Sequence, residues 1–246
     1  MILRQFLHQK SVAISYLFGC AGHACCAVVD PVGDIRPYLR AADETGMRIR
    51  FVIDTHVHAD HRSPGRNLAR EADARYVLHA SADVTFATRT VEDGDRLPLG
   101  NVVVDVMHTP GHAPEHICLL VSDRTRADEP WFVLTGHTLM AGDVGRTELA
   151  TDAASGALTL FFSLQRLKAL PDHVEVLPGA YAGSACGRRL SGKPFSTIGF
   201  ERRHNAAFKI DAADEFVGFM LQEIPPVPEG AAELRAWNSG ARPEAR

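Results

Sequence analysis

The chain has 246 residues, of which 46% are hydrophobic, and this is enough to build a full core in one large domain. Its 26 Lys and Arg against 30 Asp and Glu give a net charge of −4, which provides no overall field to attract nucleic acid or an anionic membrane. No linker or internal repeat divides the sequence. We therefore predict a single domain over residues 1–246, with a loosely structured tail from about residue 225.

The amino-terminal region contains a mostly apolar stretch, residues 11–29, that follows two basic residues as a signal peptide does. Ser, Gly and His residues interrupt this stretch, and it is too short to span a bilayer. We therefore expect a cytoplasmic protein. The five cysteines have neither zinc-finger spacing nor the frame of a disulfide-rich domain, so we expect them to be reduced and buried.

Hydrophobic periodicity predicts strands and helices in the following order along the chain. Strands are predicted over 2–7, 12–18 and 25–29, a helix over 35–42 ending at Gly46, and a buried strand over 49–53. Further helices are predicted over 66–74 and 158–170, and further strands over 76–79, 102–107, 117–121, 131–134 and 174–177. Two mixed β-sheets packed face to face with helices outside, an αββα sandwich of the α/β class, would bury these runs and collect the strand-end loops along one edge.

A dense histidine cluster, Thr-His-Val-His-Ala-Asp-His at 55–61, follows the buried strand 49–53. Side chains two residues apart on a strand point to the same face, so His56 and His58 would project together where the strand ends. Asp60 and His61 lie in the turn just beyond. Neutral imidazole is the commonest metal ligand in proteins, and the cluster therefore predicts a metal site.

Two further histidines, His112 and His137, also lie just after predicted strands. Each follows a glycine, Gly111 or Gly136, which lets the backbone turn sharply before the imidazole. Three strand-end histidines from three segments predict one shared site.

These motifs, together with their order and spacing, resemble those of the metallo-β-lactamase superfamily. The matching segments are 55–61, His-Thr-Pro-Gly-His at 108–112 and Leu-Thr-Gly-His at 134–137 with the residues that follow it to 146. The segments 29–31, 92–95, 182–187 and 196–202 resemble the persulfide dioxygenase (sulfur dioxygenase) branch, including its rhodanese-linked members. The resemblance covers residues 1 to about 225 and implies the αββα sandwich.

The chain departs from the superfamily pattern at two positions. Family members carry Asp where this chain has His137, and His where it has Ala180. In the dinuclear hydrolases of the family these two groups bridge the metals and hold the second one, so a two-metal hydrolase is disfavoured. Persulfide dioxygenases use one iron, and their ligand positions correspond here to His56, His112 and His137. An imidazole in place of the carboxylate removes one negative charge, which should raise the redox potential of the iron.

The resemblance implies an enzyme, a non-heme iron dioxygenase with one Fe²⁺ per chain. Its substrates would be O₂ and the persulfide of a low-molecular-weight thiol such as glutathione, and its products sulfite and free thiol. The resemblance is also compatible with a homodimer and with a rhodanese partner. Hydrogen-bond partners of the ligand rings, or further ligands, are expected among His58, Asp60 and His61. Asp143 is expected to have a structural role, pairing with Arg146, rather than to replace the carboxylate missing at position 137.

The carboxylates of a glutathione-like substrate need hydrogen-bond donors. The richest basic and hydroxyl cluster consists of Arg188, Arg189, Lys193, Ser196, Thr197 and Arg202. A solvated loop is the alternative interpretation of this segment. Cys186, within the same region, is expected to be a packing residue because no neighbour marks it as activated.

Two other functions stay open. The first is a one-metal Zn²⁺ hydrolase of a thioester or lactone, because three histidines plus water form a recognised catalytic zinc arrangement. The second is a non-catalytic member that binds metal or persulfide, because fold does not determine function.

Overall fold

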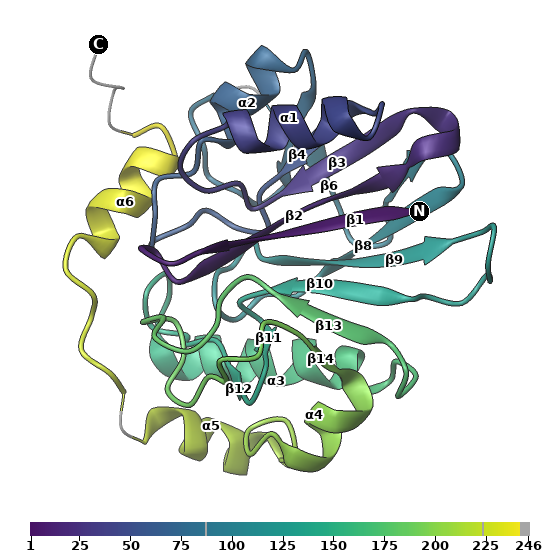
Figure 1. Ribbon diagram of the computed structural model, residues 1–246. Coiled ribbons are helices and arrows are strands. Elements are labelled where there is room, and N and C mark those ends of the chain that lie inside the picture. The colour runs from purple at the N-terminus through teal and green to yellow at the C-terminus, as the bar shows by residue number, and fades with distance from the viewer. Residues whose placement is uncertain (87, 223, 242–246) are drawn as a thin grey trace.

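Two β-sheets packed face to face, with helices on both outer faces, form the body of the protein (Figure 1). The computed structural model describes residues 1–86, 88–222 and 224–241. Within these ranges each large sheet has six strands. The first sheet consists, in spatial order, of β1 (Ile2–His8), β2 (Ala13–Cys20), β3 (Cys25–Val29), β4 (Arg48–Ile53), β5 (Arg75–His79) and β6 (Arg89–Val91). The predicted αββα sandwich is confirmed.

The second sheet carries two of the candidate histidines at its strand ends. In spatial order it consists of β14 (Ser196–Thr197), β13 (Glu175–Pro178), β10 (Phe132–Gly136), β9 (Ile117–Asp123), β8 (Val102–His108) and β7 (Arg96–Leu99). A small hairpin of β11 (Leu139–Met140) and β12 (Asp143–Val144) follows β10. β10 pairs antiparallel with β9 and parallel with β13, so this sheet is mixed.

The first sheet is antiparallel at one edge and parallel over β3 to β6. Parallel neighbours need crossover connections, which α1 (Arg36–Glu44) provides between β3 and β4, and α2 (Gly65–Glu71) between β4 and β5. Pro37 in the first turn of α1 presets the helical backbone, and Gly46, at φ +64°, ends the turn that follows. These crossovers bring the carboxyl end of β4 to the edge where the histidine cluster begins.

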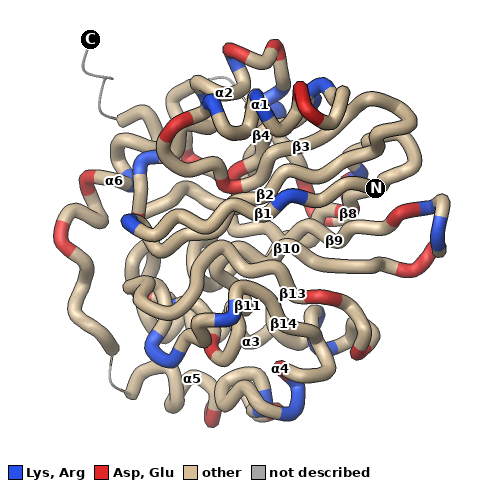
Figure 2. The backbone as a smooth tube through the Cα atoms, in the orientation of Figure 1, with Lys and Arg blue, Asp and Glu red and all other residues tan. Residues whose placement is uncertain are grey.

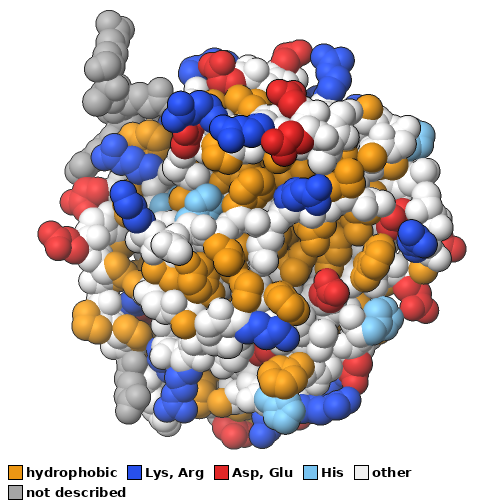
Figure 3. All heavy atoms as spheres, viewed as in Figure 1, with side chains coloured by type: hydrophobic (Ala, Val, Ile, Leu, Met, Phe, Trp, Pro, Cys, Tyr) orange, Lys and Arg blue, Asp and Glu red, His pale blue; other side chains and the backbone are white. Residues whose placement is uncertain are grey.

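The main core lies between the two sheets and is built from their inward-facing side chains. Phe18 of β2 meets Phe132 of β10 edge to face at 5.7 Å, and both rings are buried. Partly buried Met1, Leu3 and Tyr181 continue this core toward the surface. In Figure 3 hydrophobic side chains gather across the middle of the visible face, over β1, β2 and β10.

The helices on the second sheet form a separate apolar layer. α3 (Ala153–Lys168), α4 (Ile198–His204) and α5 (Ala213–Leu221) cover this face. α3 begins five residues before the predicted start because the Asp152 side chain accepts the N–H of Ser155 and caps the helix. Periodicity did not predict α4 or α5, because helices of seven and nine residues carry too few turns for a clear pattern.

The end of the chain differs from the predicted loose tail. Residues Ala231–Asn238 form α6, in which Ala231 and Asn238 are buried, and residues 242–246 lie outside the described part. In Figure 1 this helix stands at the side of the sandwich, joined to α5 by a coil that runs along the edge of the molecule. Its position rests on hydrogen bonds to residues far away in sequence, which no local pattern could indicate.

Charged side chains are interspersed over the surface, as the net charge of −4 suggests. Figure 2 shows Lys and Arg alternating with Asp and Glu around the fold, without a face of one sign in this view. None of the described helices is long and apolar enough to cross a membrane.

A partly buried hydrogen-bond network around His8 makes stability depend on pH. His8 Nε2 lies 2.8 Å from Ser15 Oγ and 3.2 Å from the hydroxyl of Tyr38. Burial, and then the nearby His61, lower the pKa of His8 from 6.5 to about 4. The unfolded chain therefore binds more protons between these two values, and stability is lost as pH falls from 6.5 toward 4.

We expect His8→Gln to weaken this pH dependence. Because solvent screens a partly exposed ring, the difference should be on the order of 1 kcal/mol. Urea unfolding of the metal-free protein at pH 4.5, 5.5 and 7 measures it. Equal slopes of unfolding free energy against pH in the two proteins would contradict the prediction.

Candidate metal centre

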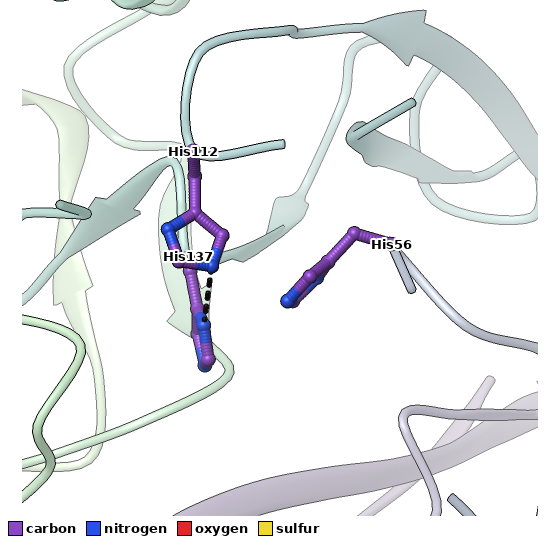
Figure 4. Close-up of side chains that lie close together, drawn as sticks. All are labelled: His56, His112 and His137. Atoms are coloured by element: carbon purple, nitrogen blue, oxygen red, sulfur yellow. Dashed lines mark hydrogen bonds between the residues drawn. The ribbon is translucent and has the colours of Figure 1, made fainter. Parts of the chain in front are cut away.

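Three histidines from three separate loops converge at one edge of the sandwich. His56 follows β4, His112 lies in the turn after β8, and His137 directly follows β10. One ring nitrogen of each lies within 4.8 Å of the others (Figure 4). His112 Nε2 is 3.2 Å from His137 Nδ1, and His56 faces this pair across the site. The structure thus brings together the three residues that the sequence predicted as one site.

Glycines let two of these histidines reach the site. Gly111 has φ +142°, and a Cβ there would lie 2.5 Å from the backbone of Leu160. Gly136 has φ +48°, and a Cβ there would lie 2.6 Å from Thr55 Oγ1 and from His116 Nε2. Both positions therefore require glycine for conformation and for space.

All three rings are buried and are held in the neutral form. Burial, followed by the neighbouring histidines, lowers the pKa of His56 well below its ordinary value. The same two causes lower the pKa of His112 to about 3, and burial also lowers the pKa of His137. Neutral imidazole is the form that binds metal.

Hydrogen bonds fix which nitrogen of each ring faces the site. The Thr55 hydroxyl donates to Asp30 Oδ2, so it accepts from His56 Nδ1 at 3.0 Å and leaves the lone pair of His56 on Nε2. His112 Nδ1 donates to the carbonyl of Arg146 at 2.7 Å, which leaves its lone pair on Nε2 as well. His56 Nε2 is buried without a hydrogen-bond partner in the described structure. A metal ion is the partner that such a convergent set of lone pairs fits.

His58 turns away from the three-histidine site. Its Nε2 lies 3.1 Å from Asp30 Oδ1 and its Nδ1 3.5 Å from Asp60 Oδ1. Burial alone would lower the pKa of His58, but the carboxylates of Asp30 and Asp60 raise it well above its ordinary value. The ring therefore lies between two carboxylates, which suits a role in orienting the loop.

Asp60 and His61 lie beside the site. His61 Nδ1 is 3.1 Å from Asp60 Oδ1, and Asp60 Oδ2 is 4.0 Å from His137 Nε2. Burial would raise the pKa of Asp60, but His61 and the other nearby histidines hold it well below its usual range. Asp60 also forms candidate cation-binding groups with His58 and His61 and with His137 and Cys186.

His116 was missed by the sequence analysis. It is fully buried, stacks on His56 with ring centroids 5.0 Å apart, and accepts the backbone N–H of His137 on Nε2 at 3.1 Å. Thr109 and Thr138 accept from its Nδ1. Its place in the sequence, just before the strand Ile117–Asp123, does not by itself distinguish it from an ordinary histidine.

Asp143 is structural, but its partners differ from the predicted one. Its Oδ2 accepts the backbone N–H groups of Arg188 at 2.6 Å and Arg189 at 2.8 Å. Arg146 instead pairs with Glu148. Asp143 and Glu148 lie three and two residues from Arg146 in sequence, so the sequence alone does not show which carboxylate pairs with it. The path of the backbone after β12 decides between them. Ala180 is buried, and its methyl group offers no ligand atom.

Most of the predicted substrate-binding cluster is engaged in internal bonds. The guanidinium of Arg188 donates to the carbonyls of Phe219 and Gln222, and Arg202 pairs with Asp172. Ser196 donates to Glu201, and Thr197 caps α4. The Lys193 ammonium lies over the ring of Phe195, 4.3 Å from its centroid. Arg188 and Arg189 also line a pocket of about 440 Å³, whose lining includes none of the three histidines. The substrate role of the cluster stays a prediction.

The five cysteines are free and buried, as predicted. Burial, and then the charge of Asp60, raise the pKa of Cys186 well above its ordinary value. The thiol therefore stays protonated at neutral pH, although it lies beside Asp60 and His137.

Comparison with known proteins identifies the family. A family model described as the metallo-beta-lactamase superfamily matches residues 13–179. The chain belongs to this superfamily. A metallo-beta-lactamase structure from Staphylococcus aureus superposes with a TM-score of 0.93 at 30% identity, covering 100% of this chain and 74% of that one. The structure of ETHE1 from Myxococcus xanthus superposes with a TM-score of 0.84 at 29% identity, covering 98% and 100%.

The names of related proteins refer to two different activities. The human mitochondrial persulfide dioxygenase ETHE1 is 26% identical over 231 residues, covering 93% of this chain and 84% of that protein. A hydroxyacylglutathione hydrolase of Rhodospirillum rubrum is 27% identical over 251 residues, covering 90% and 93%. The resemblance to both the superfamily and its ETHE1-like members is confirmed, and the relatives are enzymes.

Proposed function

We propose that this superfamily member is a mononuclear iron persulfide dioxygenase that oxidises a low-molecular-weight thiol persulfide with O₂. The observation that carries the proposal is the convergence of the lone pairs of His56 and His112 with His137, while His58 faces Asp30 and Asp60. This arrangement favours one metal held by three imidazoles. The likeness to ETHE1 of Myxococcus xanthus over 98% of the chain supports the same reading.

The proposed reaction is balanced by one water molecule. A persulfide RSSH, O₂ and H₂O give RSH and sulfurous acid, which ionises to sulfite. The outer sulfur gains both oxygen atoms of O₂ and is oxidised, while O₂ is reduced. Water then cleaves the S–S bond: its oxygen goes to the sulfite and a proton goes to the free thiol. An iron ion held by His56, His112 and His137 would relay electrons from sulfur to O₂ and would bring the two reactants together.

The protein residues position the three rings and keep water out. Thr55 and the Arg146 carbonyl hold His56 and His112 in single tautomers, and His116 holds the backbone of His137. His137 would bind through Nδ1, the nitrogen that faces His112, which places its Nε2–H toward the ionised Asp60. Preset rings of this kind lose little freedom when a ligand arrives.

An oxygen-electrode assay tests the proposed reaction. Protein purified without oxygen and loaded with Fe²⁺ should consume O₂ with glutathione persulfide and form sulfite in equal amount. Stoichiometric zinc in the purified protein, with no uptake after iron loading, would instead favour the hydrolase, which thioester and lactone substrates would then test. A protein that binds no metal would favour a non-catalytic role.

His137→Asp examines the substituted position. A carboxylate adds one negative charge beside the metal, which stabilises Fe³⁺ relative to Fe²⁺. We therefore expect the variant to keep stoichiometric iron, to have a lower Fe³⁺/Fe²⁺ midpoint potential, and to retain or gain oxygen uptake. Redox titration followed by iron absorbance measures the shift. An unchanged potential would mean that residue 137 is not a ligand.

A further inference from the structure

The carboxy-terminal helix α6 is bonded to the backbone of the histidine loop, residues 56–63. Asn238 is buried, and its side-chain NH₂ donates to the carbonyls of His58 and His61, each at 2.8 Å. Its side-chain oxygen accepts the N–H of Ser63 at 2.9 Å. One amide group thus satisfies three backbone groups of a loop some 175 residues earlier in the chain.

Arg235, one turn earlier in α6, holds the other end of the same loop. Its guanidinium donates to the carbonyl of Val57 at 2.8 Å and to both carboxylate oxygens of Glu115 at 3.0 Å. Glu115, which is buried, in turn accepts the N–H of Val57 at 2.9 Å. Both backbone groups of the residue after His56 are therefore fixed through this ion pair.

The coil before α6 is bonded to the loop that supports His112. The guanidinium of Arg146 donates to the carbonyls of Pro225 at 2.7 Å and Pro226 at 3.2 Å. The carbonyl of the same Arg146 accepts Nδ1–H of His112. Residues 225–238 therefore connect the support of His112 with the loop of His56 along one edge of the molecule (Figure 1).

The histidine loop depends on these contacts because it has no regular secondary structure of its own. No helix or strand is assigned between the end of β4 at Ile53 and the start of α2 at Gly65. Buried backbone groups without a partner cost about 1–3 kcal/mol each, so the bonds from α6 help to keep the loop on its path. A metal site loses affinity when its ligands are displaced by a fraction of an ångström.

From these contacts we infer that Asn238 and Arg235 are positioning residues that set the metal affinity of the three-histidine site. The inference rests on the proposed metal centre, but not on the reaction carried out there. Helix α6 holds His56 at its distance from His112 and His137. Loss of its bonds widens the site without removing any ligand.

Asn238→Asp tests the inference because it keeps the shape of the side chain and the acceptor for Ser63. It replaces the NH₂ group by an oxygen that faces two carbonyl oxygens. Co²⁺ serves as the probe, titrated into metal-free protein under nitrogen and followed by its visible absorption bands. We expect Co²⁺ binding to weaken by about 10–100-fold and the bands to shift, as for the loss of outer hydrogen-bond partners at other metal sites.

Glu233→Ala provides the matched control, because Glu233 is exposed on the same helix. It should bind Co²⁺ with the wild-type affinity and spectrum. Thermal unfolding of each metal-free protein shows whether the variant is folded. If Asn238→Asp does not fold, Arg235→Lys replaces it, because Lys lacks the planar fork whose two NH₂ groups bond Val57 and both oxygens of Glu115.

Wild-type Co²⁺ affinity and bands in a folded Asn238→Asp or Arg235→Lys variant would overturn the inference. This outcome is separate from failure of the proposed function. Tight Co²⁺ binding by the wild-type protein, without O₂ consumption when it is loaded with iron, would contradict the proposed dioxygenase activity. That result would leave the positioning role of Asn238 and Arg235 intact.

Discussion

His112→Ala is expected to abolish stoichiometric iron binding and persulfide-dependent oxygen uptake. The change removes one of three converging ring nitrogens, and the remaining His56 and His137 cannot enclose an ion from three sides. The loss in metal affinity should exceed the roughly 10–100-fold that removal of an outer hydrogen-bond partner costs. Metal analysis after gel filtration and the oxygen electrode measure the two effects.

The fold should survive this change. His112 lies in a turn, and its Nδ1 bond to the Arg146 carbonyl is one of several that hold that segment. His173→Ala is the matched control, because His173 has an exposed side chain far from the site in the loop before β13. Full iron content and full oxygen uptake in His112→Ala would show that His112 is not a metal ligand, and the proposed ligand set would then be wrong.

Gly136→Ala is expected to lower both stability and metal binding. The residue has φ +48°, and its new Cβ would lie 2.6 Å from Thr55 Oγ1 and His116 Nε2. Left-handed backbone costs an alanine about 1 kcal/mol, and overpacking of a rigid interior costs about 1–3 kcal/mol more. The same contact would push His116 away from the backbone of His137.

Gly46→Ala separates these two costs. Gly46 has a similar φ of +64°, but a Cβ there would meet nothing within 4 Å. We expect about 1 kcal/mol of destabilisation and unchanged iron binding for Gly46→Ala, against about 2–4 kcal/mol and weakened iron binding for Gly136→Ala. Urea unfolding and metal titration measure both quantities. Equal effects of the two changes would mean that the space around Gly136 does not matter.

Much of this fold follows from local patterns in the sequence. The runs 49–53 and 102–107 are apolar except for Arg50 and Asp105, and runs of this kind predicted buried strands. Their number favoured two sheets covered by helices. The short elements were not predicted, because two-residue strands such as β11 and β14 and the seven-residue α4 carry too little periodicity. Tertiary hydrogen bonds decide whether such segments are regular.

Only part of the candidate site could be predicted in the same way. His56, His112 and His137 were found because each follows an apolar strand, and strand ends at one edge of a sheet meet in space. The partners of His58 could not be found, because Asp30 lies 28 residues earlier, at the end of a neighbouring parallel strand. His116 was missed because a single histidine beside a strand carries no signal until its ring is seen against His56.

The sequence by itself determined the sandwich, the three histidines and the two substitutions, His137 and Ala180, because these depend on residue type and local order. The tertiary structure decided that ring nitrogens of the three histidines converge, that His58 faces Asp30, and that α6 holds the histidine loop. The residues in these contacts lie 25 to 180 positions apart in sequence. Contacts over such separations form only when the whole core brings their strands and loops together.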